Sequence, residues 1–314
     1  MEFFLLILGL TVLVVGGEFL VKGAVGIARN LEISPLVIGL TVVSFGTSAP
    51  ELLVSLQAAT EGSPEIAVGN VIGSNIANLA LVLGVTVLIF PIIVERQTKL
   101  IDWPVMMLAT IFFYIFLSDG EIKLWEGIVL FSSLIVFVAW RIRKSRKESK
   151  LIIDEHVDNE STFLAVGYLM LGLIGLYFGS EWFVDGAVGI ADYLDVPKGV
   201  IGVTVVAFGT SAPELVVSCV AAYRKQSDIS IGTLIGSNIF NIMAVIGLTS
   251  IVSPIDLNGL GVSQFLNFDM YWVTGIAVAL LPMLYFGAKF GRLKGALLLV
   301  SYLFYVSIIV SANI

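Results

Sequence analysis

The 314-residue sequence is poor in the side chains that thiol and imidazole chemistry require. It contains one cysteine, Cys219, so no disulfide can form within the chain. Its one histidine, His156, lies in a polar stretch, which argues against a histidine-based metal centre in an apolar segment. The sequence offers no nucleophile paired with a base. We therefore expect a protein that is not an enzyme and that needs no cofactor.

Charged residues are also scarce. They make up 13% of the chain, whereas soluble domains carry about 25%. Hydrophobic residues make up 58%, and the mean hydropathy is +1.00. This composition excludes a soluble core and predicts a multi-pass protein whose main partner is the lipid bilayer, with no nucleic-acid partner. The first apolar run lacks the basic start and cleavage site of a signal peptide, so we expect it to remain as a helix.

The sequence does contain apolar runs long enough to cross a bilayer, which takes about 17–25 residues. We count ten of them, five in each half of the chain. The predicted fold is therefore an all-α membrane protein with ten transmembrane helices. The runs fall at 3–28, 35–60, 66–92, 100–118, 123–142, 163–191, 197–223, 229–254, 268–287 and 294–312.

The two halves are copies of each other. Residues 38–55 and 201–218 are identical at fifteen of eighteen positions, at an offset of 163. Because each half has an odd number of spans, the second copy must enter the membrane from the opposite side. Such inverted repeats place a transporter's substrate site near the midplane. The expected parts are an N-terminal repeat 1–142 with its motif at 38–91, a linker 143–162, and a C-terminal repeat 163–314 with its motif at 201–254.

Lysine and arginine are distributed unevenly between the predicted loops. With the N-terminus outside, the inner loops hold fourteen of these residues and the outer loops hold two. Basic residues favour the cytoplasmic side. The sequence therefore predicts that both termini lie outside, that the linker 143–162 is cytoplasmic, and that the chain resides in a plasma membrane.

Each half carries Gly-Thr-Ser-Ala-Pro-Glu inside an apolar run, at 46–51 and 209–214. Proline removes a helical hydrogen bond and clashes with the carbonyl four residues earlier, so helices 2 and 7 are predicted to break here. Irregular backbone at membrane depth is tolerated where it is buried or lines a wet cavity. A carboxylate at that depth costs about 2.5–3.5 kcal/mol. Two acids at matching positions, Glu51 and Glu214, predict one shared site.

The third helix of each half carries a second repeated motif, Gly-x-x-Ile-Gly-Ser-Asn-Ile-x-Asn, at 69–78 and 232–241. Its serine and last asparagine are four residues apart and share one helical face. Its glycines, also four apart, allow close helix approach. The middle asparagines fit a ligand role and a purely interhelical role equally well. The serines are Ser74 and Ser237, and the last asparagines are Asn78 and Asn241. The glycines are Gly69, Gly73, Gly232 and Gly236, and the middle asparagines are Asn75 and Asn238.

Together, the two motifs supply only oxygen donors. Such a set favours calcium, sodium or magnesium over zinc or copper. Magnesium gives up its water reluctantly and suits an all-protein cage less well. Two carboxylates balance the charge of one calcium ion. The candidate ligands are Glu51, Glu214, Thr47, Ser48, Thr210, Ser211, Ser74, Ser237, Asn78 and Asn241, with carbonyls freed by the helix breaks.

At these motifs the chain resembles the calcium/cation antiporter superfamily, and within it the sodium/calcium exchanger group. The paired motifs look like the family's two alpha repeats, and the resemblance covers nearly the whole chain. It implies a ten-helix inverted-repeat fold in which the first and sixth helices slide across the rest. It also implies exchange of sodium for calcium by alternating access, with these two ions as transported partners. A monomer is the expected unit.

The resemblance also implies roles for individual residues. Glu51 and Glu214 would be the main calcium ligands, aided by Thr47 and Thr210, partly through backbone oxygen. Potassium-dependent relatives carry an aspartate where this chain has Asn241, so potassium cotransport is not favoured. Sodium sites are implied around the backbone of Ser44 and Ala207 and around Ser48, Ser211, Ser74, Ser237, Asn78 and Asn241.

Two questions stay open from the sequence. In the first helix Glu18 and Lys22 are spaced to pair, whereas Glu181 and Asp185 in the sixth have no such local partner and are candidates for an ion path. Two rival functions also remain. One is a proton/calcium antiporter that uses the same acids as proton carriers, and the other is a calcium-permeable channel.

Overall fold

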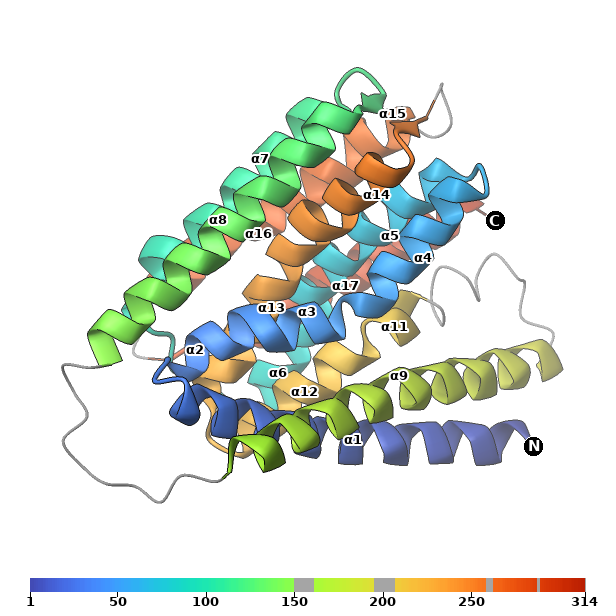
Figure 1. Cartoon of the computed structure of the whole chain (residues 1–314). Helices are drawn as coiled ribbons and strands as arrows, with labels where there is room; N and C mark the ends of the chain where they lie inside the picture. Colours follow the sequence, from blue (N-terminus) through green and yellow to red (C-terminus); the bar gives the residue numbers. More distant parts are fainter. Residues whose placement is uncertain (150–160, 195–206, 258–261, 287–288, 314) are drawn as a thin grey trace.

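The computed structural model describes the chain except for residues 150–160, 195–206, 258–261, 287–288 and 314 (Figure 1). Eight of the described helices are long and apolar enough to cross a membrane, or nine if one bent pair forms a single span. The predicted start of the seventh helix, at 197, lies outside the described residues, so the count of ten is not tested there. Within the described residues the all-helical prediction holds apart from an isolated bridge between Ile92 and Phe290 and one antiparallel pair of two-residue strands, β1 (Glu121–Ile122) and β2 (Ile255–Asp256).

The first half contains five predicted spans, some divided by π-helical segments, which carry the label η. The last helix of this half is longer than predicted, so the basic residues at 143–147 lie on its final turns rather than in a linker. The elements are α1 (Glu2–Asn30), α2 (Pro35–Ile38), η1 (Gly39–Val43), α3 (Ser44–Thr47), α4 (Ala49–Thr60), α5 (Pro64–Ile76), η2 (Ala77–Val82), α6 (Leu83–Ile89), η3 (Thr98–Asp102), α7 (Trp103–Leu117) and α8 (Leu124–Ser149).

The second half repeats this order where it is described. A π-helical segment begins at the end of the second motif in both halves, and another opens the fourth span. The elements are α9 (Thr162–Tyr193), α11 (Ala207–Thr210), α12 (Ala212–Tyr223), α13 (Ser227–Phe240), η5 (Asn241–Ile246), α14 (Gly247–Val252), α15 (Val262–Gln264), η6 (Phe265–Asp269), α16 (Met270–Tyr285) and α17 (Arg292–Asn313).

Both predicted helix breaks are present. In the first half α3 ends at Thr47 and α4 starts at Ala49, with a bend of 43° between the two parts. Ser48 between them has φ −88° and ψ 4°, and Ser211 at the matching break has φ −89° and ψ 2°. Proline at the start of each second part lacks the N–H that a continuous helix would need. The two halves therefore break with the same backbone conformation.

The core of the molecule is the pair of spans that carry the second motif. The most apolar window of the span Ser227–Val252 is completely buried, and that of Pro64–Ile89 is 78% buried. The corresponding windows of the other six long described spans are 11% to 44% buried. Of the predicted close glycine contacts, those of Gly232 and Gly236 are confirmed, because a Cβ there would lie 2.6 Å from a backbone carbonyl of Leu36 or Leu40. Gly69 and Gly73 meet no described backbone atom that closely.

Helices α1 and α9 form a separate antiparallel pair at one side of the molecule (Figure 1). Glycines recur every seven residues along the surface where they touch. A Cβ at any of them would lie within 3.0 Å of the other helix's backbone. Backbone therefore packs on backbone along this line, which we call the glycine seam. It consists of Gly9, Gly16, Gly23, Gly172, Gly179 and Gly186.

Candidate functional site

The two repeated acids occupy equivalent places at the helix breaks. Glu51 lies in the first turn of α4, and Glu214 lies in the first turn of α12. Both side chains are fully buried, so neither faces lipid, and they are close enough to repel each other electrostatically. The positive end of each helix dipole favours a negative charge at this position. The fold therefore brings together the two carboxylates that the sequence predicted would share a site.

Hydroxyl groups connect the two halves around Glu214. Thr47 Oγ1 at the end of α3 lies 3.3 Å from Ser237 Oγ on α13. Both hydroxyls are close enough to Glu214 to interact with its carboxylate, although the geometry is not that of a hydrogen bond. Ser44 Oγ lies 2.8 Å from the carbonyl of Gly39 and 3.0 Å from that of Thr233. The first-half break is thus fixed against the second-half motif helix.

Several predicted ligands are buried without a hydrogen bond to any described residue. These atoms are both carboxylate oxygens of each glutamate, the hydroxyls of two serines, and amide atoms of two asparagines. Leaving a buried polar group unpaired costs about 1–3 kcal/mol, so such groups rarely gather in a native protein without a purpose. The oxygens among them are suited to a hard cation. The residues are Glu51, Glu214, Ser48, Ser211, Asn78 and Asn241.

Three asparagines of the second motif are connected by hydrogen bonds. Asn241 Nδ2 donates to Asn75 Oδ1 at 3.1 Å, and Asn75 Nδ2 donates to the Asn238 carbonyl at 3.4 Å. Asn238 Nδ2 in turn donates to the Leu234 carbonyl at 2.7 Å. Asn75 therefore joins the helices and orients the Asn241 amide, whose Oδ1 is left without a described donor.

The remaining predicted ligands fit the site less directly. Ser74 is buried on α5, whereas Thr210 is only half-buried. The Ser44 carbonyl, an implied sodium ligand, already accepts from the Ser48 N–H at 2.9 Å and from Thr47 Oγ1 at 3.3 Å. Ala207 begins α11, directly after residues that lie outside the described part of the chain.

Two supporting residues were missed by the sequence analysis. Asn70 Nδ2 donates to the Glu51 carbonyl at 3.2 Å and to Ser55 Oγ at 2.9 Å, which holds the start of α4. Ser180 Oγ on α9 donates at 2.8 Å to the carbonyl of Gly209, one of the carbonyls predicted to be freed by proline. Asn70 lies inside the second motif and could have been considered, whereas nothing in the sequence signals Ser180.

A cavity of about 230 Å³ lies between α9 and the two helix breaks. Pro50 and Thr210, which adjoin Glu51 and Ser211 in the chain, form one side of it. Its α9 side carries two of the acids that the sequence left open, together with neutral side chains. These α9 residues are Tyr177, Ser180, Glu181, Val184 and Asp185.

The described residues contain no cluster of three or more His, Cys, Asp or Glu side chains that could hold a metal ion. The prediction of a cation site built from two carboxylates and neutral oxygens is taken up below.

Comparison with known proteins points to one family. A family profile described as sodium/calcium exchanger protein matches residues 1–143 and 164–311. The putative antiporter CaxA of Alkalimonas amylolytica is 36% identical over 98% of each chain. The sodium/calcium exchanger MaX1 of Methanosarcina acetivorans is 32% identical over 98% of this chain and 97% of its own. A solved structure of the sodium–calcium exchanger NCX_Mj, soaked with Na⁺ and Sr²⁺, matches with a TM-score of 0.83 at 35% identity, covering 98% of this chain and 97% of that one.

Proposed function

The chain belongs to the sodium/calcium exchanger family, and we propose that it is a secondary antiporter that exchanges sodium for calcium across a membrane. The observation that carries this proposal is the set of buried oxygens without described partners at the two helix breaks. They come from both halves of the chain, and they include two carboxylates close enough to repel each other. A divalent cation relieves that repulsion and supplies the missing interactions.

The proposed main calcium ligands are Glu51 and Glu214, with Thr47 and Thr210 beside them. Sodium ions occupy neighbouring oxygens of the same cage, drawn from Ser48, Ser211, Ser74, Ser237, Asn78 and Asn241 and from the backbone of Ser44 and Ala207. Asn241, held by Asn75, presents its oxygen rather than its amide hydrogens to that cage.

Exchange follows from the cost of burying unpaired charge. Two carboxylates without a cation oppose any rearrangement that shuts water out of the site. One calcium ion neutralises them, and so do sodium ions spread over adjacent oxygens. Only the loaded states switch readily between the two sides, so the protein exchanges ions instead of leaking them.

The cavity beside α9 provides a route to this site. It reaches Pro50 and Thr210 at the two breaks, and Glu181 and Asp185 place negative charge along it. Such charge raises the local concentration of cations. This arrangement supports an ion path for the two acids of α9, the role that the sequence had left open.

The full architecture in this proposal is ten helices in two inverted repeats, 1–142 and 163–314, joined by a cytoplasmic segment, with both termini outside. The matching breaks at Ser48 and Ser211 support it, as do the glycine seam's two halves, which are related by the same offset of 163. The basic inner loops support a plasma-membrane orientation with these ends outside.

Flux measurements in proteoliposomes test the function. Radiolabelled calcium uptake should follow an imposed sodium gradient and not a potassium gradient. Glu51→Gln and Glu214→Gln should each lower this flux by at least about 100-fold, because removing one partner from a buried charged site costs about 3–5 kcal/mol. Glu61→Gln, at an exposed acid after α4, is the matched control and should keep the flux.

Three results would contradict the proposal. Full flux in either glutamine variant would remove the charge argument. Uptake driven by a pH gradient without sodium would favour a proton/calcium antiporter. Electrical currents far above carrier turnover would identify a channel.

A further inference from the structure

Helices α1 and α9 occupy equivalent places in the two halves, but they differ in how they meet the helix breaks. Beside α9 lies the cavity that Ser180 and Glu181 help to line. The offset of 163 relates these two residues to Gly17 and Glu18 of α1. At Gly17 helix α1 packs directly on α12, because a Cβ there would lie 2.8 Å from Val216 Cγ1. The α9 side is therefore open where the α1 side is closed.

An ion pair joins α1 to the end of α12 next to this closed contact. Arg224 Nε and Nη2 both donate to Glu18 Oε2, at 2.9 and 2.7 Å. Val220, one turn before Arg224, also lies against Gly17, since a Cβ on that glycine would be 3.6 Å from Val220 Cγ2. The spacing on α1 had suggested Lys22 as the partner of Glu18, and the fold supplies Arg224.

The equivalent positions on the other side cannot form such a pair. The offset of 163 relates Glu18 to Glu181 and Arg224 to Glu61. Glu181 lines the cavity beside α9, and Glu61 is exposed after α4. Both are acids, and like charges repel each other. Attraction across the contact is therefore available to only one of the two sides.

We propose that the Glu18–Arg224 pair is a latch that keeps the α1 side of the candidate ion site closed while the α9 side is open. This inference rests on the proposed function, because alternating access requires the α1 side to open in its turn. In the proposed orientation the latched side is the cytoplasmic one.

The glycine seam determines when the latch must open. It packs α1 on α9 backbone to backbone, so a movement of α9 that closes its cavity carries α1 with it. That movement pulls Glu18 away from Arg224. Since the mirror-image conformation would bring two acids together instead, the latch favours the conformation described here over its counterpart.

Labelling of a single cysteine tests the latch in the purified full-length protein, in detergent with calcium present. Cys219→Ser removes the native thiol, and Val220→Cys places a thiol at a buried position against Gly17. Glu18→Gln and Arg224→Gln should each raise the rate of maleimide labelling by about two- to fivefold, the range expected for an exposed ion pair. Their double variant should show no larger increase, because both changes remove the same interaction.

Exchanging the two charges separates a latch from a merely structural role. The double variant Glu18→Arg/Arg224→Glu recreates the pair with its charges swapped, and it should return labelling to the parent rate. Lys225→Gln removes one cation from the same exposed turn and is the matched control, which should label like the parent. Parent-like labelling of both single variants would overturn the proposal, and so would a swapped pair that labels as fast as the single variants.

Calcium binding shows whether the latch or the proposed function has failed. The latch variants keep every candidate ion ligand, so calcium should raise their thermal stability as it does that of the parent. If calcium did not stabilise the parent, the proposed function would fail. Unchanged labelling in variants that calcium does stabilise would overturn the latch alone.

Discussion

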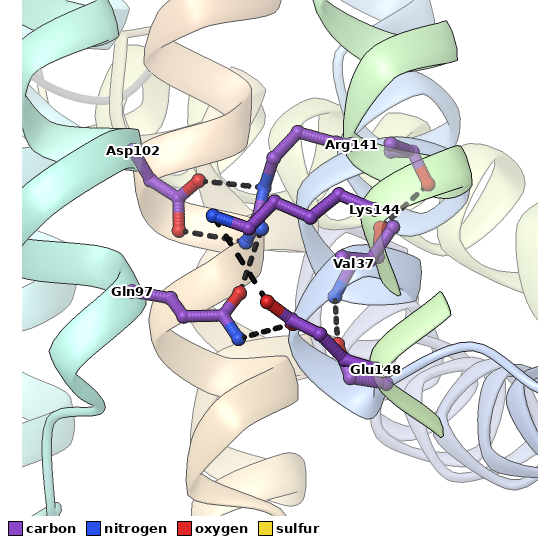
Figure 2. Close-up of polar contacts among 8 residues, drawn as sticks. Val37, Gln97, Asp102, Arg141, Lys144 and Glu148 are labelled. Atoms are coloured by element: carbon purple, nitrogen blue, oxygen red, sulfur yellow. Dashed lines mark hydrogen bonds and ion pairs between the residues drawn. The ribbon is translucent and has the colours of Figure 1, made fainter. Parts of the chain in front are cut away.

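At the scale of single residues, Arg141 and Asp102 form a fully buried ion pair (Figure 2). The Nε atom of Arg141 on α8 lies 3.0 Å from Asp102 Oδ1, and Arg141 Nη2 donates to Asp102 Oδ2 at 3.2 Å. Its Nη1 donates to Gln97 Oε1 at 2.7 Å, and Gln97 Nε2 donates to Glu148 Oε2 at 2.8 Å. The count of basic residues in the predicted loops gave no sign of this pairing. The pair joins α8 to η3 at the start of the fourth span.

We predict that Arg141→Met lowers the free energy of unfolding by about 3–5 kcal/mol, because it leaves Asp102 as a buried charge without its partner. The double variant Arg141→Met/Asp102→Leu should recover most of that loss, since both charges are then absent. Denaturant unfolding in detergent measures the double-mutant cycle. Lys144→Met is the control, because the half-exposed Lys144–Glu148 pair, at 4.0 Å, should contribute less than about 1 kcal/mol. The prediction would be refuted if Arg141→Met lowered the free energy of unfolding by no more than Lys144→Met does.

The candidate ligands were predictable from the sequence because the same chemistry occurs twice. Glu51 and Glu214 each stand next to a helix breaker in an apolar run, and burial of both was expected from that alone. The residue with which a charged side chain pairs in the fold was not predictable. Glu18 could have paired with a neighbour on its own helix, but it meets Arg224, 206 residues away. Such pairings depend on how helices approach each other, which no local pattern encodes.

At the scale of helices, the glycine seam sets the distance between α1 and α9. A Cβ on Gly23 would lie 2.4 Å from the backbone nitrogen of Leu169, and a Cβ on Gly172 would lie 2.5 Å from that of Leu20. Backbone atoms cannot rotate away as a side chain can. The two helices would have to separate along their length to admit one methyl group, so we infer that they move as a single unit.

We predict that Gly23→Ala and Gly172→Ala each destabilise the protein by about 1–3 kcal/mol, the usual cost of overpacking. The control is Gly167→Ala, also on α9, where a Cβ meets no described atom within 4 Å. Alanine there should raise stability by up to about 1 kcal/mol through its better helix propensity. Thermal unfolding in detergent gives all three values. If Gly23→Ala behaved like Gly167→Ala, the close packing of α1 on α9 would be wrong.

The sequence predicted elements with strong local causes and missed those with tertiary causes. Proline in the motif Gly-Thr-Ser-Ala-Pro-Glu predicted both helix breaks, and apolar run length predicted the described spans to within a few residues, apart from the end of α8. The π-helical segments had no such signal. The close contacts of Gly232 and Gly236 were expected, but the seam between α1 and α9 was not, because its seven-residue spacing only matters once the two helices lie together.

At the scale of the whole molecule, the two halves meet at the candidate ion site. Glu51 belongs to the first half and Glu214 to the second, and Thr47 reaches Ser237 across the same boundary. The duplicated sequence already predicted one site shared by two copies. Only the fold could show that buried oxygens from both copies are left without described partners there. A cation at this position would therefore stabilise the association of the two halves.

We predict that calcium raises the thermal stability of the whole chain, by about 2.7 kcal/mol at 100 times its dissociation constant, because it binds the folded state alone. Sodium should shift the calcium titration to higher concentration, since both ions use the same oxygens. Glu51→Gln and Glu214→Gln should each remove most of the calcium effect, and Glu61→Gln should leave it intact. The measurement needs no membrane, so it separates binding from transport. If sodium and calcium stabilised the protein additively, the two ions would occupy independent sites, and exchange through one shared cage would be excluded.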